Sequence, residues 1–361
     1  MSHGSSWGYQ VVRITADFQQ ERVLHPAAMA LLNQFFSRGW ADPNKLNHNS
    51  RNTAILLQQV REKFADLLKV RPDELEFLGE SDLGFQLGIS GLLKPESKLF
   101  YSSIDRQRIF AVAANEENNG RQVICLPVNH NGQVGEFAAT ANDVVVWQVA
   151  NGESGNLQIN PATQAAIFAD CTASGVDQLP NFDYQTALFD SASWQGPAGF
   201  GILIIKQTKV WRNPLPHNDH TRVPGTFSIP LAIASSVALE GYLADSDIRA
   251  KLKEQIVNFL NSEIPDIDIA SVLDGLSKFL SFSIAGIEAD RLLLSLEDLG
   301  FAVDSGSACK SADMQPSHVL AAMGRPITGN IRLTLHKDIT EQMVKEFCQA
   351  LKSCVEKLRG N

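Results

Sequence analysis

Residues 189–205 read FDSASWQGPAGFGILII, a turn rich in Gly and Pro that leads directly into an apolar run at Ile202–Ile205. Comparable short apolar runs occur at Val123–Leu126, Val144–Trp147 and Ala166–Ala169. Short runs that are apolar throughout are typical of strands buried on both faces of a mainly parallel sheet. The sequence therefore predicts a doubly wound α/β lobe.

Helical patterns surround these runs. Before them, one apolar helix face is formed by Leu57, Val60, Phe64, Leu67 and Leu68. The chain turns helical again from about Pro230, and it closes with the same spacing at Val344, Phe347, Leu351, Val355 and Leu358. We expect residues 16–230 to form a large α/β domain, and residues 1–15 and 231–361 to form a smaller α+β domain.

Charge and cysteine content narrow the class of protein. The 361 residues include 31 Lys and Arg against 40 Asp and Glu, a net charge of −9, and no basic run that could follow a phosphate backbone. The N-terminus has no apolar signal segment, and no apolar run is long enough to cross a bilayer. Five irregularly spaced cysteines fit a reducing compartment. We expect a cytoplasmic protein with neither a nucleic-acid partner nor a membrane segment.

Two residues stand where chemistry could occur. Asp170 follows the run Ala166–Ala169, and ligands of open α/β sheets bind beyond the carboxyl ends of strands. The carboxylate could face a ligand or cap the next turn. Cys309 lies among small residues beside Lys310, which would favour the thiolate, so it could be a nucleophile or a free surface cysteine. No Cys-x-x-Cys pattern occurs, and we expect no metal site.

These segments together resemble the cysteine desulfurases of iron–sulfur cluster assembly, in the class V aminotransferase-fold family, over nearly the whole chain. The most specific match runs from Gly306-Ser307-Ala308-Cys309 through residues 316–324 to Ile331-Arg332-Leu333-Thr334. The resemblance implies a fold-type I pyridoxal-phosphate transferase architecture, with a mainly parallel, seven-stranded-type sheet in the large lobe and a smaller α+β lobe carrying the Cys309 loop. It implies that Cys309 forms the persulfide and that Arg332 binds the substrate carboxylate.

Other family positions are retained. Asp170 matches the aspartate that holds the protonated pyridine nitrogen of pyridoxal phosphate and so maintains its electron sink. Gly196-Pro197 and Gly199 match the turn after the family's lysine. Arg222 through Thr226 resembles the loop whose threonine, here Thr226, reaches the cofactor phosphate of the neighbouring subunit. The resemblance therefore implies a homodimer.

Several cofactor positions depart from the family. Counting back from Gly196-Pro197, the Schiff-base lysine falls on Ser193, so no internal aldimine is expected there. The ring-stacking histidine falls on Arg106, the asparagine beside the ring on Gly152, and the glutamine that bonds the ring hydroxyl on Ala173. A single changed lysine could be a trapping mutation, but these further changes indicate a pocket altered as a whole.

The phosphate cradle is altered as well. The family's Gly-Ala-Thr at a helix start falls on Glu80-Ser81-Asp82. A helix N-terminus favours an anion, but one carboxylate about 5 Å from a phosphate charge costs roughly 3 kcal/mol at an effective dielectric near 20. We interpret Ser81 and Asp82 as ordinary helix N-caps.

The resemblance and its departures favour a degenerate desulfurase homologue that acts as a binding, regulatory or sulfur-accepting protein. We expect no pyridoxal phosphate, or weak binding, and partners that include a second copy, an active desulfurase relative or a sulfur-transfer protein. The alternative is an active pyridoxal-phosphate-dependent desulfurase or aminotransferase-like enzyme that uses Lys310 or Lys206. A third is a retained scaffold in which Cys309 has no role. We also expect Cys309 to react faster than Cys125, which lies in an apolar strand.

Overall fold

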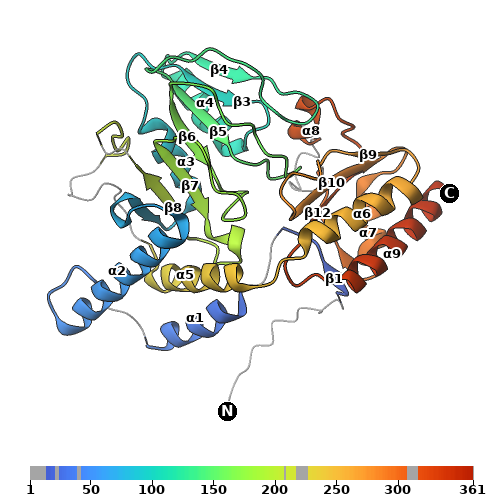
Figure 1. The fold of residues 1–361 in the computed structure, drawn as a ribbon, viewed down its shortest axis with the longest axis horizontal. Helices are drawn as coiled ribbons and strands as arrows, with labels where there is room; N and C mark the ends of the chain where they lie inside the picture. The colour runs from blue at the N-terminus through green and yellow to red at the C-terminus, as the bar shows by residue number, and fades with distance from the viewer. Residues whose placement is uncertain are drawn as a thin grey trace.

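The computed structural model describes residues 14–20, 24–38, 42–206, 209–216, 227–306 and 316–360. Two lobes lie side by side in Figure 1, one around a seven-stranded sheet and one around a three-stranded sheet near the C-terminus. The strands of the large sheet are β2 (Leu75–Leu78), β3 (Leu99–Ser102), β4 (Val123–Leu126), β5 (Val144–Gln148), β6 (Ala166–Asp170), β7 (Thr186–Asp190) and β8 (Gly201–Ile205). Their order across the sheet is β2-β8-β7-β6-β5-β3-β4.

Four of the six pairings in this sheet are parallel, which confirms the predicted mainly parallel sheet. The strand β8 differs because it pairs antiparallel with both β7 and β2. Parallel neighbours need a long crossover, usually a helix. The connection between β7 and β8 is only residues 191–200, with a short 3₁₀ turn at Ser191–Trp194, so the chain reverses direction.

Helices cover both faces of the large sheet. Successive side chains of a strand point to opposite faces, and in β5 Val145 and Trp147 join one apolar core while Val144 and Val146 join another. The first core includes α1 (Pro26–Arg38), α2 (His48–Leu68) and α5 (Ile229–Ala244), and the second includes α3 (Ser81–Ser90) and α4 (Gln107–Asn118). Burial on both sides explains why these strands are apolar throughout.

The second lobe has its own core between the three-stranded sheet and its helices. Its elements are β9 (Ile267–Ile269), β10 (Phe279–Ile284), β12 (Asn330–Thr334), α6 (Arg249–Glu263), α7 (Ala289–Glu297), α8 (His318–Ala322) and α9 (Glu341–Arg359). A two-stranded parallel sheet adds β1 (Ala16–Asp17) to β11 (Phe301–Ala302).

Two segments pack in a different lobe from the one to which the expected domain boundaries assign them. Ala16 and Phe18 belong to the core of the second lobe, because β1 pairs with β11. The helix α5 packs against α1 and α2 in the large lobe. On packing grounds the chain passes between the lobes near residue 18 and again near residue 245. No helix among the described residues is long and apolar enough to span a membrane.

Candidate functional site

The lobes meet at the carboxyl ends of β6 and β7, and two small cavities lie there. The first, which we call the Ser193 cavity, has a volume of about 110 Å³ and is lined by residues of both lobes, among them Ser193, Lys278 and His336. The second, the Arg332 cavity, has a volume of about 190 Å³. Arg106 and Gln20 line both, so these two side chains stand between the two parts of the cleft.

Asp170 ends β6 at this edge of the sheet and is 1% exposed. Its Oδ1 accepts hydrogen bonds from the backbone N–H of Thr172 at 2.9 Å and from the Thr172 hydroxyl at 2.6 Å. Its Oδ2 lies 3.5 Å from Nε of Arg106. The carboxylate therefore caps the next turn through one oxygen and faces a cation in the cleft through the other.

Arg106 is the N-cap residue of α4, which directs its side chain into the cleft. Its Nε and the facing Oδ2 of Asp170 are both buried, and among the described residues neither makes a hydrogen bond. A Cβ added to Gly152 would lie 3.2 Å from Nη2 of Arg106, and 3.6 Å from the Cβ of Ala173. The small residues at 152 and 173 thus leave the volume that the guanidinium occupies.

Ser193 lies in the 3₁₀ turn after β7. Its hydroxyl donates a hydrogen bond of 2.7 Å to the backbone carbonyl of Asp190. A Cβ at Gly175 would come within 2.4 Å of the Ser193 hydroxyl oxygen, and Gly175 has φ +54°, so glycine is required at that position by both space and backbone conformation. The local structure fits a short side chain at 193.

The start of α3 differs in one respect from the sequence interpretation. The N-cap is Glu80, whose carboxylate accepts from the backbone N–H of Asp82, and Ser81 is the first helical residue. The Ser81 hydroxyl instead donates to Oδ2 of Asp190 at 2.7 Å. Asp82 pairs with Nε of Arg108 at 2.5 Å on the surface. The interpretation of Ser81 and Asp82 as N-caps is wrong, because the preceding acid takes that role.

Arg332 lies on β12 and lines the second cavity, with a side chain that is 14% exposed. Its Nη1 lies 3.9 Å from Oε1 of Glu153. Glu153 also accepts a hydrogen bond of 2.6 Å from Ser317, at the start of α8. The arginine therefore faces a carboxylate of the protein across the cavity where the resemblance places a substrate carboxylate.

Several residues named from the sequence lie elsewhere. Cys309, Lys310 and Thr226 fall outside the described residues. The Nζ of Lys206 lies 3.9 Å from the ring centroid of Tyr184, and Lys206 is absent from the walls of both cavities. Cys125 is exposed, so the expectation that its strand buries it is wrong: β4 is the last strand at one end of the sheet, where one side of each residue lacks a neighbouring strand.

A buried charge cluster beside the Ser193 cavity was not found from the sequence. Arg249 donates to Asp177 at 2.9 and 3.2 Å and to Asp247 at 2.8 Å, and Nζ of Lys278 lies 3.2 Å from Asp177. Burial alone would raise the pKa of Asp177, but Lys278 and Arg249 outweigh it and hold that pKa at about 2. No local spacing signals this cluster, because Asp177, Arg249 and Lys278 come from distant segments.

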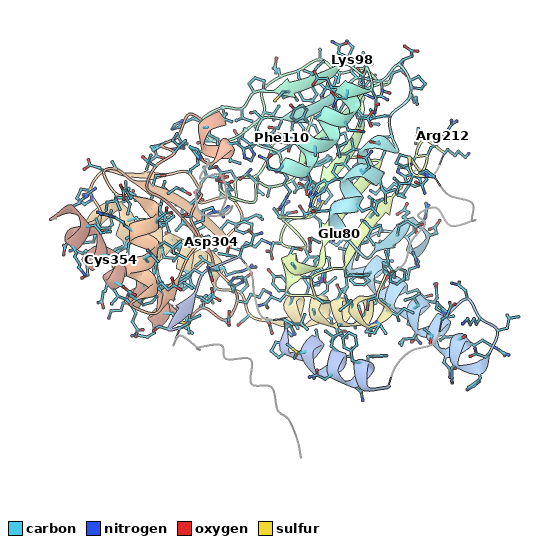
Figure 2. The ribbon with its side chains drawn as sticks, turned by 180° about the vertical axis from the view of Figure 1, so that it is seen from behind. Glu80, Lys98, Phe110, Arg212, Asp304 and Cys354 are labelled. Atoms are coloured by element: carbon cyan, nitrogen blue, oxygen red, sulfur yellow. The ribbon has the colours of Figure 1, made fainter. Side chains whose placement is uncertain are left out.

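Among the described residues, no group of three or more His, Cys, Asp or Glu side chains could hold a metal ion. His217 and His220, which flank Asp219 in the sequence, lie outside those residues. Figure 2 shows Glu80 on the large lobe and Asp304 on the second lobe. The backbone of Asp304 exchanges two hydrogen bonds with that of Arg332, of 2.8 and 3.1 Å. On the second lobe the cleft wall thus includes the paired backbones of Asp304 and Arg332, and on the large lobe it includes the ends of β6 and β7.

Comparison with known proteins places this architecture in a family. A model of the family described as aminotransferase class-V matches residues 24–347. Cysteine desulfurase 2 of Trichormus variabilis is 27% identical over 360 residues, covering 92% of this chain and 90% of the relative. The cysteine desulfurase IscS of Dictyoglomus turgidum is 25% identical over 374 residues, covering 95% and 94%.

Solved structures agree on the fold. A NifS-like protein superposes with a TM-score of 0.83 at 21% identity, covering 94% of this chain and 99% of that one. The apo structure of cysteine desulfurase from Thermococcus onnurineus superposes with a TM-score of 0.80 at 15% identity, covering 94% of each. The predicted fold-type I architecture is confirmed. This chain belongs to the class V aminotransferase family and is a homologue of the cysteine desulfurases.

Proposed function

We propose that this chain forms no internal aldimine with pyridoxal phosphate and acts as a binding, regulatory or sulfur-accepting protein. The observation that carries the proposal is the contact of Arg106 with Asp170. The carboxylate that the resemblance assigns to the pyridine nitrogen already faces a guanidinium at 3.5 Å. A protonated pyridine ring and this guanidinium compete for the same oxygen.

The other cofactor positions support the same conclusion. At the position that the resemblance gives to the lysine, Ser193 has a hydroxyl bonded to the backbone rather than an amine. At the phosphate position, the Ser81 hydroxyl donates a hydrogen bond to Asp190. The carboxylate of Glu80 accepts a hydrogen bond from a backbone N–H at the start of α3, so that N–H is already satisfied. The residues present therefore do not fit pyridoxal phosphate.

Absorbance spectroscopy tests this proposal. The protein is purified with and without added pyridoxal phosphate, dialysed, and scanned for the visible band of an aldimine. We expect the dialysed samples to have the same spectrum. A band that persists after dialysis and shifts when cysteine is added would contradict the proposal, and a catalytically active desulfurase prepared alongside shows that the band would be detected.

The sulfur-accepting role concerns Cys309. We propose that its thiolate takes the outer sulfur atom from the persulfide of an active desulfurase, whose own cysteine leaves as the thiolate. The test mixes the two proteins with cysteine and traps persulfides by alkylation for mass spectrometry. Persulfide on wild-type protein but not on Cys309→Ser protein is expected, and an equal amount on both would contradict the role.

We also propose a homodimer. Large apolar side chains of the N-terminal helices are exposed in a single chain, among them Met29 at 42%, Phe36 at 57% and Ile55 at 59%. A second copy covering this face would remove apolar area from water, which is the main favourable contribution to association. Sedimentation equilibrium at micromolar concentration should give the mass of two chains, and a monomer would contradict the proposal.

A further inference from the structure

We propose that Lys278 is a reactive amine that forms an imine with a small α-oxo acid bound in the Ser193 cavity. The inference rests on the proposed function in one respect, namely that the cleft is free of pyridoxal phosphate. It differs from the lysines considered from the sequence, because Lys206 lies on Tyr184 and Lys310 lies outside the described residues.

The position of Lys278 is the first argument. It immediately precedes β10, its side chain is 7% exposed, and it lines the same cavity as Ser193. Its Nζ lies 3.5 Å from the carbonyl oxygen of Ser174 and 3.2 Å from Oδ2 of Asp177. Lysine is seldom buried to this extent unless it is paired or functional. The amine is therefore held at the cavity wall by one ion pair with Asp177 and by one long contact with the Ser174 carbonyl.

Burial favours the neutral amine of Lys278, and the ion pair with Asp177 opposes it only in part. Burial is the largest influence and lowers the pKa of its ammonium; Asp177 opposes this effect, and Arg249 adds to it. The carboxylate of Asp177 is shared between two cations, because Arg249 also donates two hydrogen bonds to it. Imine formation needs the unprotonated nitrogen, and a pKa lowered by burial increases the fraction of lysine in that form.

The cavity wall indicates the class of ligand. Arg106, Arg249, Lys278 and Lys337 line it. Among the described residues of the wall, the one carboxylate is Asp190, which already accepts a hydrogen bond from a serine. The acids that neutralise this wall stand behind it, so a carboxylate in the cavity meets cations first. A volume of about 110 Å³ admits only a few heavy atoms. A small molecule with a carboxylate and an adjacent carbonyl meets both conditions.

The reaction needs no further reagent. The lone pair of the Lys278 nitrogen forms a bond to the carbonyl carbon, and the carbon–oxygen double bond is lost. The oxygen leaves as water with the two hydrogens of the amine, and a carbon–nitrogen double bond remains. Nothing is oxidised or reduced, and hydrolysis reverses the step.

Reductive trapping tests the proposal on the full chain. The protein is incubated with glyoxylate and cyanoborohydride, and adducts are located by peptide mass spectrometry. We expect the Lys278 peptide to be labelled several times faster than the peptides of Lys253 and Lys206. Lys253 is the matched control: burial lowers its pKa to about 8, but its Nζ donates to two backbone carbonyls, at 2.7 and 3.1 Å, and it is absent from this cavity wall.

Variants separate the site from the background. Lys278→Arg keeps the positive charge beside Asp177 and should abolish the fast labelling, whereas Lys253→Arg should leave it unchanged. Acetaldehyde, which lacks the carboxylate, should label Lys278 more slowly than glyoxylate does. Labelling of Lys278 no faster than that of Lys253, or fast labelling that survives Lys278→Arg in a protein with an unchanged thermal melt, would overturn the inference.

Pyridoxal phosphate is the second probe, and it separates this inference from the proposed function. A stable visible aldimine that maps to Lys278 would overturn the proposed function, and with it the assignment of an α-oxo acid to this cavity. Absence of both the aldimine band and the glyoxylate adduct would overturn the amine and support the proposed function.

Discussion

Replacing Arg106 with alanine should destabilise the fold, because it leaves Asp170 buried without its counter-ion. At 3.5 Å two unit charges interact by about 5 kcal/mol at an effective dielectric near 20. The Arg106 side chain is one-third exposed, at 33%, so solvent screens part of this interaction. Exposed pairs contribute up to about 1 kcal/mol, and breaking a buried pair costs about 3–5 kcal/mol. We expect a loss of about 2 kcal/mol in the free energy of unfolding.

Urea unfolding of a double-mutant cycle isolates the pair. The cycle compares Arg106→Ala, Asp170→Asn and the double variant, and we expect a coupling free energy of about 2 kcal/mol. Arg108→Ala is the matched control, since Arg108 pairs with Asp82 on the surface with side chains 64% and 38% exposed, and it should change stability by no more than about 0.5 kcal/mol. A coupling below about 0.5 kcal/mol would refute the reasoning.

Chemical rescue gives an independent measurement on the same site. Methylguanidinium added to Arg106→Ala protein should fill the vacated space beside Asp170 and raise the thermal midpoint. The same addition should not raise the midpoint of the wild type or of the double variant. Equal responses of all three proteins would show that the guanidinium does not bind at this carboxylate.

Three further outcomes follow from the site. Given cysteine and added cofactor, Ser193→Lys alone should release far less alanine and sulfide than an intact desulfurase assayed alongside, because Arg106 still pairs with the carboxylate of Asp170. Comparable turnover would contradict this prediction. Asp177 has a pKa of about 2 in the fold against 3.8 unfolded, so its ionised form contributes about 2 kcal/mol to the free energy of unfolding. This contribution is present above about pH 4 and is lost as the pH falls towards about 2. Urea unfolding should therefore show that stability falls less steeply with pH in Asp177→Asn than in the wild type. Gly152→Ala should lower the free energy of unfolding by about 0.5 kcal/mol, because the added Cβ contacts Arg106, and it should have no effect in the Arg106→Ala background. Gly135→Ala, where the added Cβ meets open space, is the control. An equal loss in both backgrounds would contradict the contact.

The sequence predicted the parts of the fold that depend on local pattern. The runs at 144–147 and 166–169 lie within β5 and β6, because strands covered by helices on both faces must be apolar throughout. The reversal of β8 was not predicted, since an apolar run has the same composition in either direction. The exposure of Cys125 was missed for a related reason: the position of β4 at the end of the sheet depends on strand order.

The sequence could predict a site residue only where its neighbours in the chain fix its place in the fold. The strand-end location of Asp170 follows from the run before it. Its contact with Arg106 joins two segments more than sixty residues apart, as does the contact of Arg249 with Asp177. The N-cap of α3 was placed one residue late because a glutamate, which is uncommon there, takes the position usually held by serine or aspartate.

The contact between Arg106 and Asp170 also makes the order of substitutions in the cleft matter for stability. A chain that first changed Arg106 to histidine would leave a carboxylate that is 1% exposed facing a weaker cation, and it would lose stability before any new chemistry appeared. A chain that first gained a lysine at 193 would place an amine beside a cleft still filled by the guanidinium. Substitutions elsewhere in the cleft that leave this pair intact avoid that loss of stability, so they can accumulate one residue at a time.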